Sequence, residues 1–251
     1  MANAKVAPAE ALYLYGISPA QQAPAKIGRA GIDGAHPIEA MPCGQFLCWV
    51  SRVDQAAFSR ELETNMENLD WLAVHGVRHQ EAVGEIARTM TVVPARFGTL
   101  FSGAKALEQN VRARKAALTK AFEKIVGADE WGVKVFNARQ PQATLATPVA
   151  ASGRDYLQQK AARIKRRAES GTEDLKELAD ALARVASDSA PSGKVSGGQA
   201  DLVWQATFLV PRKKHAEWNR VLQEFVQRWS STRRIEVSGP WPPYSFVADA
   251  G

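Results

Sequence analysis

Residues 131–136 read Trp-Gly-Val-Lys-Val-Phe, an alternation of side chains that is typical of a β-strand. A helical pattern follows over residues 152–186, and then a strand over residues 201–210. A helix over about residues 213–229 and a last strand at residues 235–237 complete the series. The order β–α–β–α–β requires either a parallel neighbour or an antiparallel ferredoxin-like sheet packed by helices. The order of elements alone leaves both arrangements open.

The part of the chain before residue 130 also mixes strand and helix patterns. Residues 12–15 and 46–50 are apolar strand candidates, and one helix is expected from near Ala104 to Gly127. The sequence therefore predicts two α+β domains. The N-terminal domain is expected at residues 1–129 and the C-terminal domain at residues 130–251. Within the C-terminal domain we expect a long helix or helical hairpin at 152–186, a mobile loop at 187–200 and a Pro-rich tail at 239–247.

A further helix is expected before residue 91, because apolar or small residues recur there at helical spacing. This face comprises Leu62, Met66, Leu69, Leu72, Gly76, Val83, Ile86 and Met90. His79 falls on the same face. A lone histidine there is expected to be a core residue with a satisfied nitrogen rather than a metal ligand.

The composition is that of a globular protein. The chain has 251 residues, 45% of them apolar and 23% charged, and a formal charge of +6. This excludes a wholly disordered chain, and two cysteines, expected to be reduced, exclude a disulfide scaffold. No apolar run reaches the roughly 20 residues that span a bilayer. No signal-peptide pattern is present, so a cytoplasmic location away from membranes is the default expectation.

The excess positive charge is concentrated in one stretch, which favours either a solvated helix face or a site for an acidic partner. This basic patch consists of Arg154, Lys160, Arg163, Lys165, Arg166 and Arg167. It keeps one alternative open, a basic ferredoxin-like nucleic-acid-binding module. Such a module would expose side chains such as Val133, Val135, Trp204 and Phe208 on its sheet, although these residues are expected to form the core.

No motif predicts an enzyme. The sequence contains neither a phosphate-binding glycine loop nor a Gly-x-Ser-x-Gly elbow. His75 and His79 are four residues apart, but the Glu of a zinc-protease helix is missing between them. We expect no catalytic residue, no metal site and no cofactor.

Two segments suggest a docking surface for a partner. One is the turn at residues 94–101, and the other is the Pro-Trp-Pro-Pro-Tyr-Ser-Phe tail at residues 240–246. Both could simply pack onto their domain, or they could present a preformed apolar surface. The candidate partner-binding residues are Arg96, Phe97, Trp241, Tyr244 and Phe246. Alternatively, Arg96 is buried in a hydrogen-bonded turn, because its neighbours are apolar.

The chain resembles the gas vesicle protein F/L family along nearly its whole length. The matching segments, in the order of the family, are Leu-Tyr-Leu-Tyr-Gly-Ile at 12–17, Val-Pro-Ala-Arg-Phe-Gly-Thr-Leu-Phe at 93–101, Glu-Trp-Gly-Val-Lys-Val at 130–135, Ser-Gly-Arg-Asp-Tyr-Leu at 152–157, Ala-Thr-Phe-Leu-Val at 206–210 and Gly-Pro-Trp-Pro-Pro-Tyr-Ser-Phe at 239–246. The closing octapeptide and the Arg-Phe-Gly-Thr turn are the most specific of these. Ala95 and Leu100 depart slightly from the family pattern.

This resemblance implies an accessory or minor structural protein of gas vesicles without enzymatic activity. It also implies two α+β domains, at least one of them ferredoxin-like with an antiparallel sheet packed by helices, and we expect this fold. The implied partner is the small, very apolar shell subunit, and other gas vesicle accessory proteins are further candidates. The implied location is the gas vesicle within the cytoplasm, with the gas-facing side of the shell as one possibility. A transient chaperone and a retained shell component both fit. Removal of the tail after Gly239 is expected to weaken shell-subunit binding without unfolding the chain.

Overall fold

A computed structural model of the protein describes residues 10–21, 27–54, 58, 67–138, 172–191 and 201–247. The fold is α+β with antiparallel sheets, as expected. The chain divides into two compact units. The first unit comprises Met1–Asp129 with Pro240–Gly251, and the second comprises Glu130–Gly239. The Pro-rich tail thus belongs to the first unit, which differs from its expected place in the C-terminal domain.

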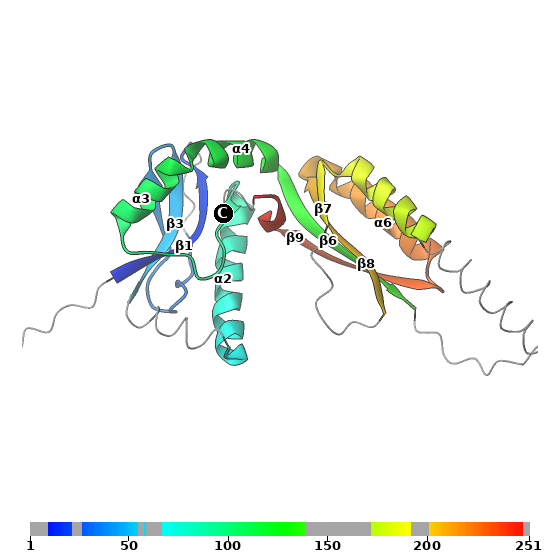
Figure 1. Cartoon of the computed structure of the whole chain (residues 1–251), viewed down its shortest axis with the longest axis horizontal. Coiled ribbons are helices and arrows are strands. Elements are labelled where there is room, and N and C mark those ends of the chain that lie inside the picture. The colour runs from blue at the N-terminus through cyan, green and yellow to red at the C-terminus, as the bar shows by residue number, and fades with distance from the viewer. Residues whose placement is uncertain are drawn as a thin grey trace, which may run out of the picture. The chain divides into compact units, whose positions relative to one another are not determined.

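The first unit is built on a five-stranded sheet (Figure 1). Its strands are β1 (Glu10–Pro19), β2 (Glu39–Cys43), β3 (Phe46–Asp54), β4 (Val93–Pro94) and β5 (Leu100–Phe101). The strand order is β2-β3-β1-β4, and β5 also pairs with β1. The proline of β4 lies at the end of this order, where a residue without an N–H group does not interrupt the ladder.

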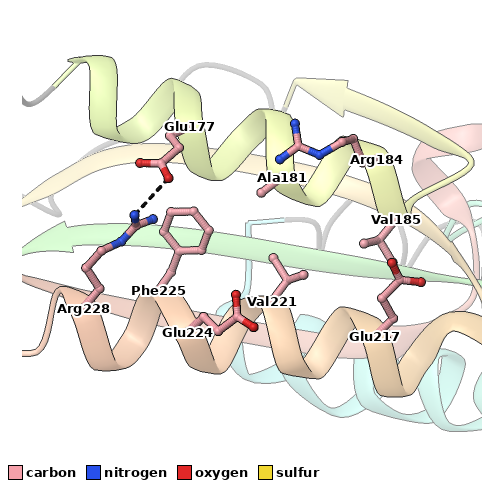
Figure 2. A pocket seen from close by; sticks show the side chains of 9 residues that line it. All are labelled: Glu177, Ala181, Arg184, Val185, Glu217, Val221, Glu224, Phe225 and Arg228. Atoms are coloured by element: carbon pink, nitrogen blue, oxygen red, sulfur yellow. Dashed lines mark hydrogen bonds and ion pairs between the residues drawn. The ribbon is translucent and has the colours of Figure 1, made fainter.

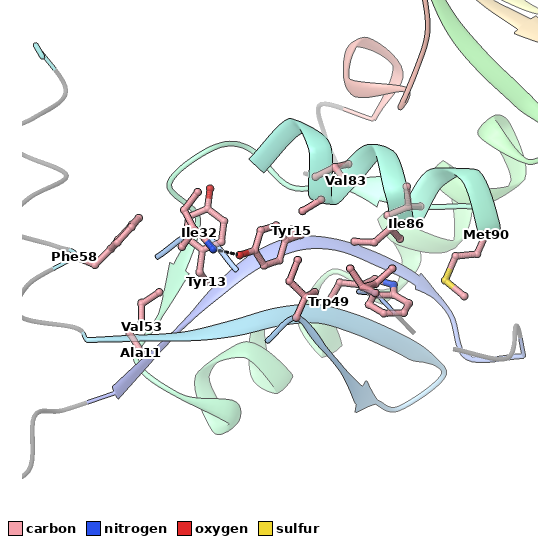
Figure 3. Close-up of a cluster of buried hydrophobic side chains, with 14 residues drawn as sticks. Ala11, Tyr13, Tyr15, Ile32, Trp49, Val53, Phe58, Val83, Ile86 and Met90 are labelled. Atoms are coloured by element: carbon pink, nitrogen blue, oxygen red, sulfur yellow. Dashed lines mark hydrogen bonds between the residues drawn. The ribbon is translucent and has the colours of Figure 1, made fainter. Parts of the chain in front are cut away.

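Helix α2 (Leu69–Thr89) packs on the sheet face that carries Tyr13, Tyr15 and Trp49. Figure 3 shows Val83 and other α2 side chains lying over these rings. Asn68 caps the helix, because its side-chain oxygen accepts hydrogen bonds from two N–H groups of the first turn.

The apolar face predicted for this helix is correct toward its C-terminal end and wrong near its start. His79, Val83 and Ile86 are buried, whereas the side chain of Leu69 is 79% exposed. Trp71 faces the core instead and stacks on the ring of His75, with their centroids 4.0 Å apart. The larger aromatic ring determines which face of the first two turns packs inward.

The opposite face of the sheet is covered by α3 (Ala104–Ala113) and α4 (Lys115–Ile125). Alternate residues of a strand point to opposite faces, so Phe46 lies across the sheet from Trp49. The Phe46 ring stacks on Phe122 of α4, at 5.7 Å between centroids. We expected one continuous helix here; the structure has two, which meet at Arg114.

The second unit has a four-stranded sheet with the order β7-β8-β6-β9 (Figure 1). In chain order it comprises β6 (Ala128–Asn137), a helix over residues 172–185, β7 (Asp188–Pro191), β8 (Leu202–Pro211), α6 (His215–Arg228) and β9 (Arg233–Trp241). The first two residues of β6 and the last two residues of β9 belong to the first unit. This β–α–β–β–α–β series with its first and third strands adjacent is the ferredoxin-like arrangement.

Strand β7 corrects the expectation of a mobile loop at residues 187–200. Its four residues pair antiparallel with β8, with Ser189 opposite Phe208. The segment lacks alternating apolar side chains, but a ladder is formed by backbone groups that every sequence supplies. Residues 192–200 lie outside the described residues.

The helical pattern predicted over residues 152–186 is confirmed where the structure describes it. Leu178, Leu182 and Val185 are buried in the core of the second unit, together with Trp218 and Phe225 of α6. Residues 152–171, including the expected helix start, lie outside the described residues.

Gly16 allows strands β1 and β4 to approach closely, which generates a test of the fold. A Cβ atom at this position would lie 2.6 Å from Val92 Cγ2 and 2.9 Å from the Val93 carbonyl oxygen. We expect Gly16→Ala to lower the free energy of unfolding of the first unit by about 1–3 kcal/mol, measured by urea unfolding. Gly84→Ala in α2 is the control, because a Cβ there meets nothing within 4 Å. Equal stability of both variants would contradict the close packing.

Candidate functional site

His79 is the buried centre of a polar cluster in the first unit. Its Nε2 atom lies 3.2 Å from the Ala95 carbonyl oxygen, and its Nδ1 atom lies 2.9 Å from the Tyr13 hydroxyl. A carbonyl oxygen only accepts hydrogen bonds, so Nε2 carries the proton and Nδ1 accepts from Tyr13. The Tyr13 oxygen in turn accepts from the Gly98 N–H, at 3.1 Å. His79 is therefore a core histidine with both nitrogens satisfied, which confirms the prediction.

The C-terminal tail joins the same cluster. Tyr244 and Phe246 lie on a single 3-10 turn, and the Tyr244 hydroxyl lies 3.2 Å from His79 Nε2. Since Nε2 is a donor, this hydroxyl oxygen accepts a second branch of its hydrogen bond. The Phe97 ring meets the His79 ring edge-on, with 5.8 Å between centroids. The two segments singled out from the sequence thus converge on one imidazole.

Arg96 itself takes no part in this buried cluster. Its side chain is exposed, and its carbonyl oxygen accepts hydrogen bonds from the Thr99 N–H at 3.2 Å and the Thr99 hydroxyl at 2.7 Å. The interpretation that Arg96 is buried is therefore wrong, because the backbone rather than the guanidinium closes the turn.

The five candidate partner-binding residues differ in their accessibility to a partner. Arg96 is exposed, and Trp241 keeps 50% of its surface. Phe97 and Tyr244 are half-buried against the core, and Phe246 is only 7% exposed. Two of the five therefore offer most of the free surface, while the other three anchor the turn and the tail.

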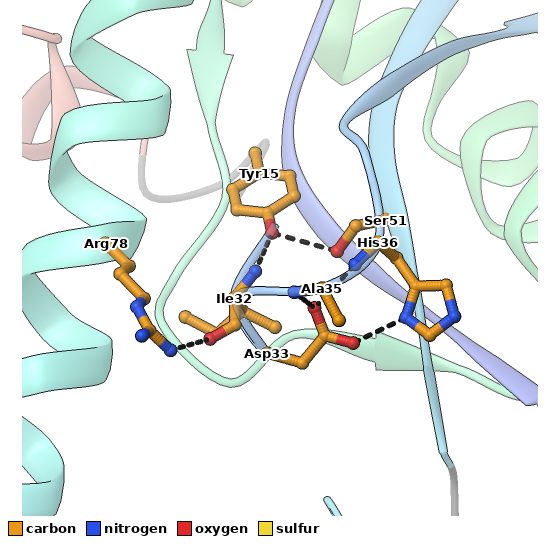
Figure 4. Close-up of polar contacts among 7 residues, drawn as sticks. All are labelled: Tyr15, Ile32, Asp33, Ala35, His36, Ser51 and Arg78. Atoms are coloured by element: carbon orange, nitrogen blue, oxygen red, sulfur yellow. Dashed lines mark hydrogen bonds and ion pairs between the residues drawn. The ribbon is translucent and has the colours of Figure 1, made fainter. Parts of the chain in front are cut away.

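A second polar cluster holds the loop before β2 against the sheet (Figure 4). The Tyr15 hydroxyl accepts from the Ile32 N–H at 2.6 Å and lies 2.9 Å from Ser51 Oγ. Burial raises the pKa of Tyr15 to about 12, so its hydroxyl stays protonated, and either this hydroxyl or that of Ser51 can donate the hydrogen bond between them. Arg78 of α2 donates to the Ile32 carbonyl at 3.2 Å.

Asp33 closes the turn that follows Ile32. Partial burial would raise the pKa of this carboxyl, but hydrogen bonds from the Ala35 and His36 N–H groups and the His36 ring lower it below its usual value. The carboxylate thus satisfies the N–H groups of the turn.

The polar roles of Tyr13, Tyr15 and Ser51 are not apparent from any local sequence pattern. The two tyrosines are two residues apart in a strand and therefore share a face, beside a helix whose packed side contains His79. The hydroxyl groups of Tyr13 and Tyr15 on the strand and the imidazole of His79 on the helix were therefore the available signal for a buried hydrogen-bonded cluster.

The remaining site expectations concern the basic patch, metals and membranes. The basic patch of residues 154–167 lies outside the described residues. Among the residues that are described, no group of three or more His, Cys, Asp or Glu could hold a metal ion. No helix in that part of the chain has the length and apolar character needed to cross a bilayer. Cys43 and Cys48 are buried and free.

The side chains considered for nucleic-acid stacking lie beneath the helices of the second unit. Val133, Val135 and Phe208 are at most 2% exposed, and Trp204 packs against the same core. Their interpretation as core residues is confirmed, and they form no exposed stacking platform.

Comparison with known proteins identifies the family. The chain matches the family described as gas vesicle synthesis protein GvpL/GvpF over residues 11–248, and it belongs to this family. It is 27% identical over 260 residues to gas vesicle protein L of Streptomyces sp. (strain CB03234), covering 95% of this chain and 93% of that protein. It is 23% identical over 238 residues to gas vesicle protein F1 of Halobacterium salinarum, with 95% and 93% covered.

Two crystal structures share the fold. The chain is similar to the gas vesicle protein GvpF of Anabaena sp. PCC7120, with a TM-score of 0.68, 20% identity, and 95% and 96% of the two chains covered. The GvpF of Microcystis aeruginosa gives the same TM-score and identity, with 94% and 98% covered. The expected gas vesicle family and α+β fold are therefore confirmed.

The buried imidazole makes the stability of the first unit depend on pH. Burial lowers the pKa of His79 to about 4 in the folded state, despite its hydrogen bond to Ala95, from an ordinary value of 6.5. Above pH 6.5 both states are neutral and this contribution is fully present. As the pH falls from 6.5 to 4, the unfolded chain binds a proton first and about 3 kcal/mol is lost.

We expect His79→Gln to remove this part of the pH dependence, measured by urea unfolding at several pH values. His36→Gln, at an exposed histidine, is the control and is expected to keep the dependence. An unchanged slope in His79→Gln would show that this imidazole does not titrate as a buried neutral group.

The anchored tail is expected to stabilise the first unit. Ending the chain after Gly239 removes the Tyr244 hydrogen bond and the buried Phe246 side chain, and we expect a loss of at least about 2 kcal/mol. Ending it after Val247 keeps both contacts and is the matched control. Thermal unfolding measures the difference, and equal melting temperatures would contradict a structural role for the tail.

Proposed function

We propose that this chain binds the small apolar shell subunit of the gas vesicle, keeps it from aggregating and supports nucleation of the vesicle. Its membership of a gas vesicle synthesis family supports a role in vesicle assembly. A shell subunit that is apolar throughout would aggregate before assembly unless a partner covered it. The role proposed is non-enzymatic.

Trp241 is the observation that carries this proposal. Its ring is half exposed, although the two prolines that follow it are buried and Phe246 is anchored in the first unit. Lys124 Nζ lies 5.3 Å from the centroid of the Phe246 ring and covers it. A rigidly held aromatic ring loses little conformational entropy on binding, which is a property of interface anchors.

The proposed docking surface comprises Trp241, Tyr244, Arg96 and Phe97. Tyr244 and Phe97 pack against the same core cluster, so the tail and the turn reach the surface of the first unit around His79. Phe246 supports this surface from below rather than contacting the partner.

Further apolar surface in the same unit supports an apolar partner. Leu69, Val74 and Val77 of α2 are 79%, 49% and 55% exposed. A single exposed aliphatic side chain carries no meaning, but three within nine residues of one helix form unusual surface.

The proposed location is the gas vesicle in the cytoplasm, on the gas-facing side of its shell if the protein is retained. Other gas vesicle accessory proteins are proposed as further partners. A transient chaperone leaves washed, floating vesicles, whereas a retained component stays with them, so immunoblotting of such vesicles distinguishes the two.

Co-expression with the shell subunit tests the proposal. We expect the tagged chain to keep the subunit soluble and to co-purify with it at high salt, because apolar contacts are not screened. Trp241→Ala is expected to reduce the co-purified subunit about tenfold, as the loss of an aromatic anchor does. The ratio of subunit to chain on a stained gel measures this.

Two variants serve as controls. Trp241→Phe keeps an aromatic ring and is expected to retain most of the binding, and Val203→Ala changes an exposed apolar residue of the second unit. Undiminished capture by Trp241→Ala would refute the docking surface. Failure of the folded wild-type chain to capture the subunit, combined with salt-sensitive binding of oligonucleotides, would favour the nucleic-acid alternative.

A further inference from the structure

The helical layer of the second unit contains a groove with an apolar floor (Figure 2). The helix over residues 172–185 and α6 form its two sides, and its volume is about 450 Å³. Ala181 and Val185 contribute to the floor from one helix, and Val221 and Phe225 contribute from the other. Val221 and Ala181 are half-buried, so they remain accessible to a partner side chain.

The walls of this groove carry charges that lack partners. Glu217 and Glu224 are seven residues apart on α6 and therefore lie on the same side, about 10 Å apart along the helix. Neither carboxylate forms an ion pair with any described residue. At one end, Glu177 and Arg228 form an ion pair of 2.9 Å across the groove.

The two helices that form the groove are acidic on balance in a basic protein, although the basic residues Arg212, Lys213 and Lys214 directly precede α6. Residues 172–185 and α6 together contain six Asp and Glu against four Lys and Arg, whereas the whole chain has a formal charge of +6. Arg184 lines the groove from the other helix, so it is the α6 side that suits a basic amphipathic segment, with apolar side chains toward the floor and two cations seven residues apart toward α6.

The sequence of this chain contains one such segment, at residues 154–168. Lys160 and Arg167 are seven residues apart, and they flank an apolar series at helical spacing. That series is Leu157, Ala161, Ile164 and Ala168. These residues lie outside the described ones, so the match is one of sequence to groove.

We propose that the groove binds residues 154–168 of a second copy of this chain, with Lys160 and Arg167 opposite Glu217 and Glu224. Exchange between two copies fills two grooves at once, as a two-fold symmetric interface does. The apolar floor supplies the contact area, and the charge pairs determine orientation, because exposed ion pairs alone stabilise little. This proposal is independent of shell-subunit binding.

Charge reversal in the full-length chain tests this pairing. We expect the wild-type chain to dimerise in sedimentation velocity runs over a concentration series, and more weakly at high salt. Either Lys160→Glu/Arg167→Glu or Glu217→Lys/Glu224→Lys should weaken dimerisation about tenfold or more, as expected for losing two charge pairs.

Mixing the two double variants provides the decisive measurement. At the two paired positions, each double variant alone has like charges in the segment and the groove, whereas the mixture brings opposite charges together at these positions. We expect a heterodimer with an affinity close to that of the wild type. A mixture that stays monomeric overturns the proposal, and so does a wild-type chain that is monomeric at every concentration.

The matched control is Glu108→Lys/Glu123→Lys, which makes the same charge change at exposed positions of α3 and α4 in the first unit. It is expected to leave dimerisation unchanged. An equal loss in this control would attribute the effect to net charge and refute the specific pairing. Failure of dimerisation with intact shell-subunit capture would refute this proposal alone.

Discussion

The first unit depends on the hydrogen bonds of the neutral His79 imidazole. The imidazole has one donor and one acceptor nitrogen, and it uses them to link strand β1, the 93–101 turn and the C-terminal tail to helix α2. A buried polar group is costly without partners, so every element that meets it must keep its place. No aliphatic side chain could supply these directional contacts, although many could fill the volume.

The need of buried polar groups for hydrogen-bond partners also distinguishes the buried aromatic residues of the first unit from the exposed one. Tyr13, Tyr15 and Trp49 are fully buried, and the hydroxyl or indole N–H of each finds a partner. Trp241 lies just before the anchored segment and keeps half of its surface. The contacts of Tyr244 and Phe246 with the first unit thus anchor the chain just after Trp241.

The elements that could be predicted from the sequence are those with an apolar run or with apolar residues at a regular spacing. Strands β1 and β3 are apolar runs that are buried along most of their length, and the C-terminal part of α2 contains buried residues at helical spacing. Strand β7 could not be predicted, because its sequence Asp-Ser-Ala-Pro shows no alternation of large apolar side chains. The exposure of Arg96 and the contact of Tyr244 with His79, 165 residues away, depend on tertiary packing that no local pattern encodes. The two segments of the candidate site could therefore be identified from the sequence, but which of their residues are exposed and which are buried could not.

The first unit is made of two segments of the chain, and all residues of the second unit lie between these segments in the sequence. During synthesis, residues 240–247 leave the ribosome after every residue of the second unit. The ferredoxin-like unit can therefore complete its sheet while the first unit still lacks Tyr244 and Phe246. A chain that is terminated at or before Gly239 has neither the tail anchor nor Trp241, so the first unit is complete only after translation has passed residue 246.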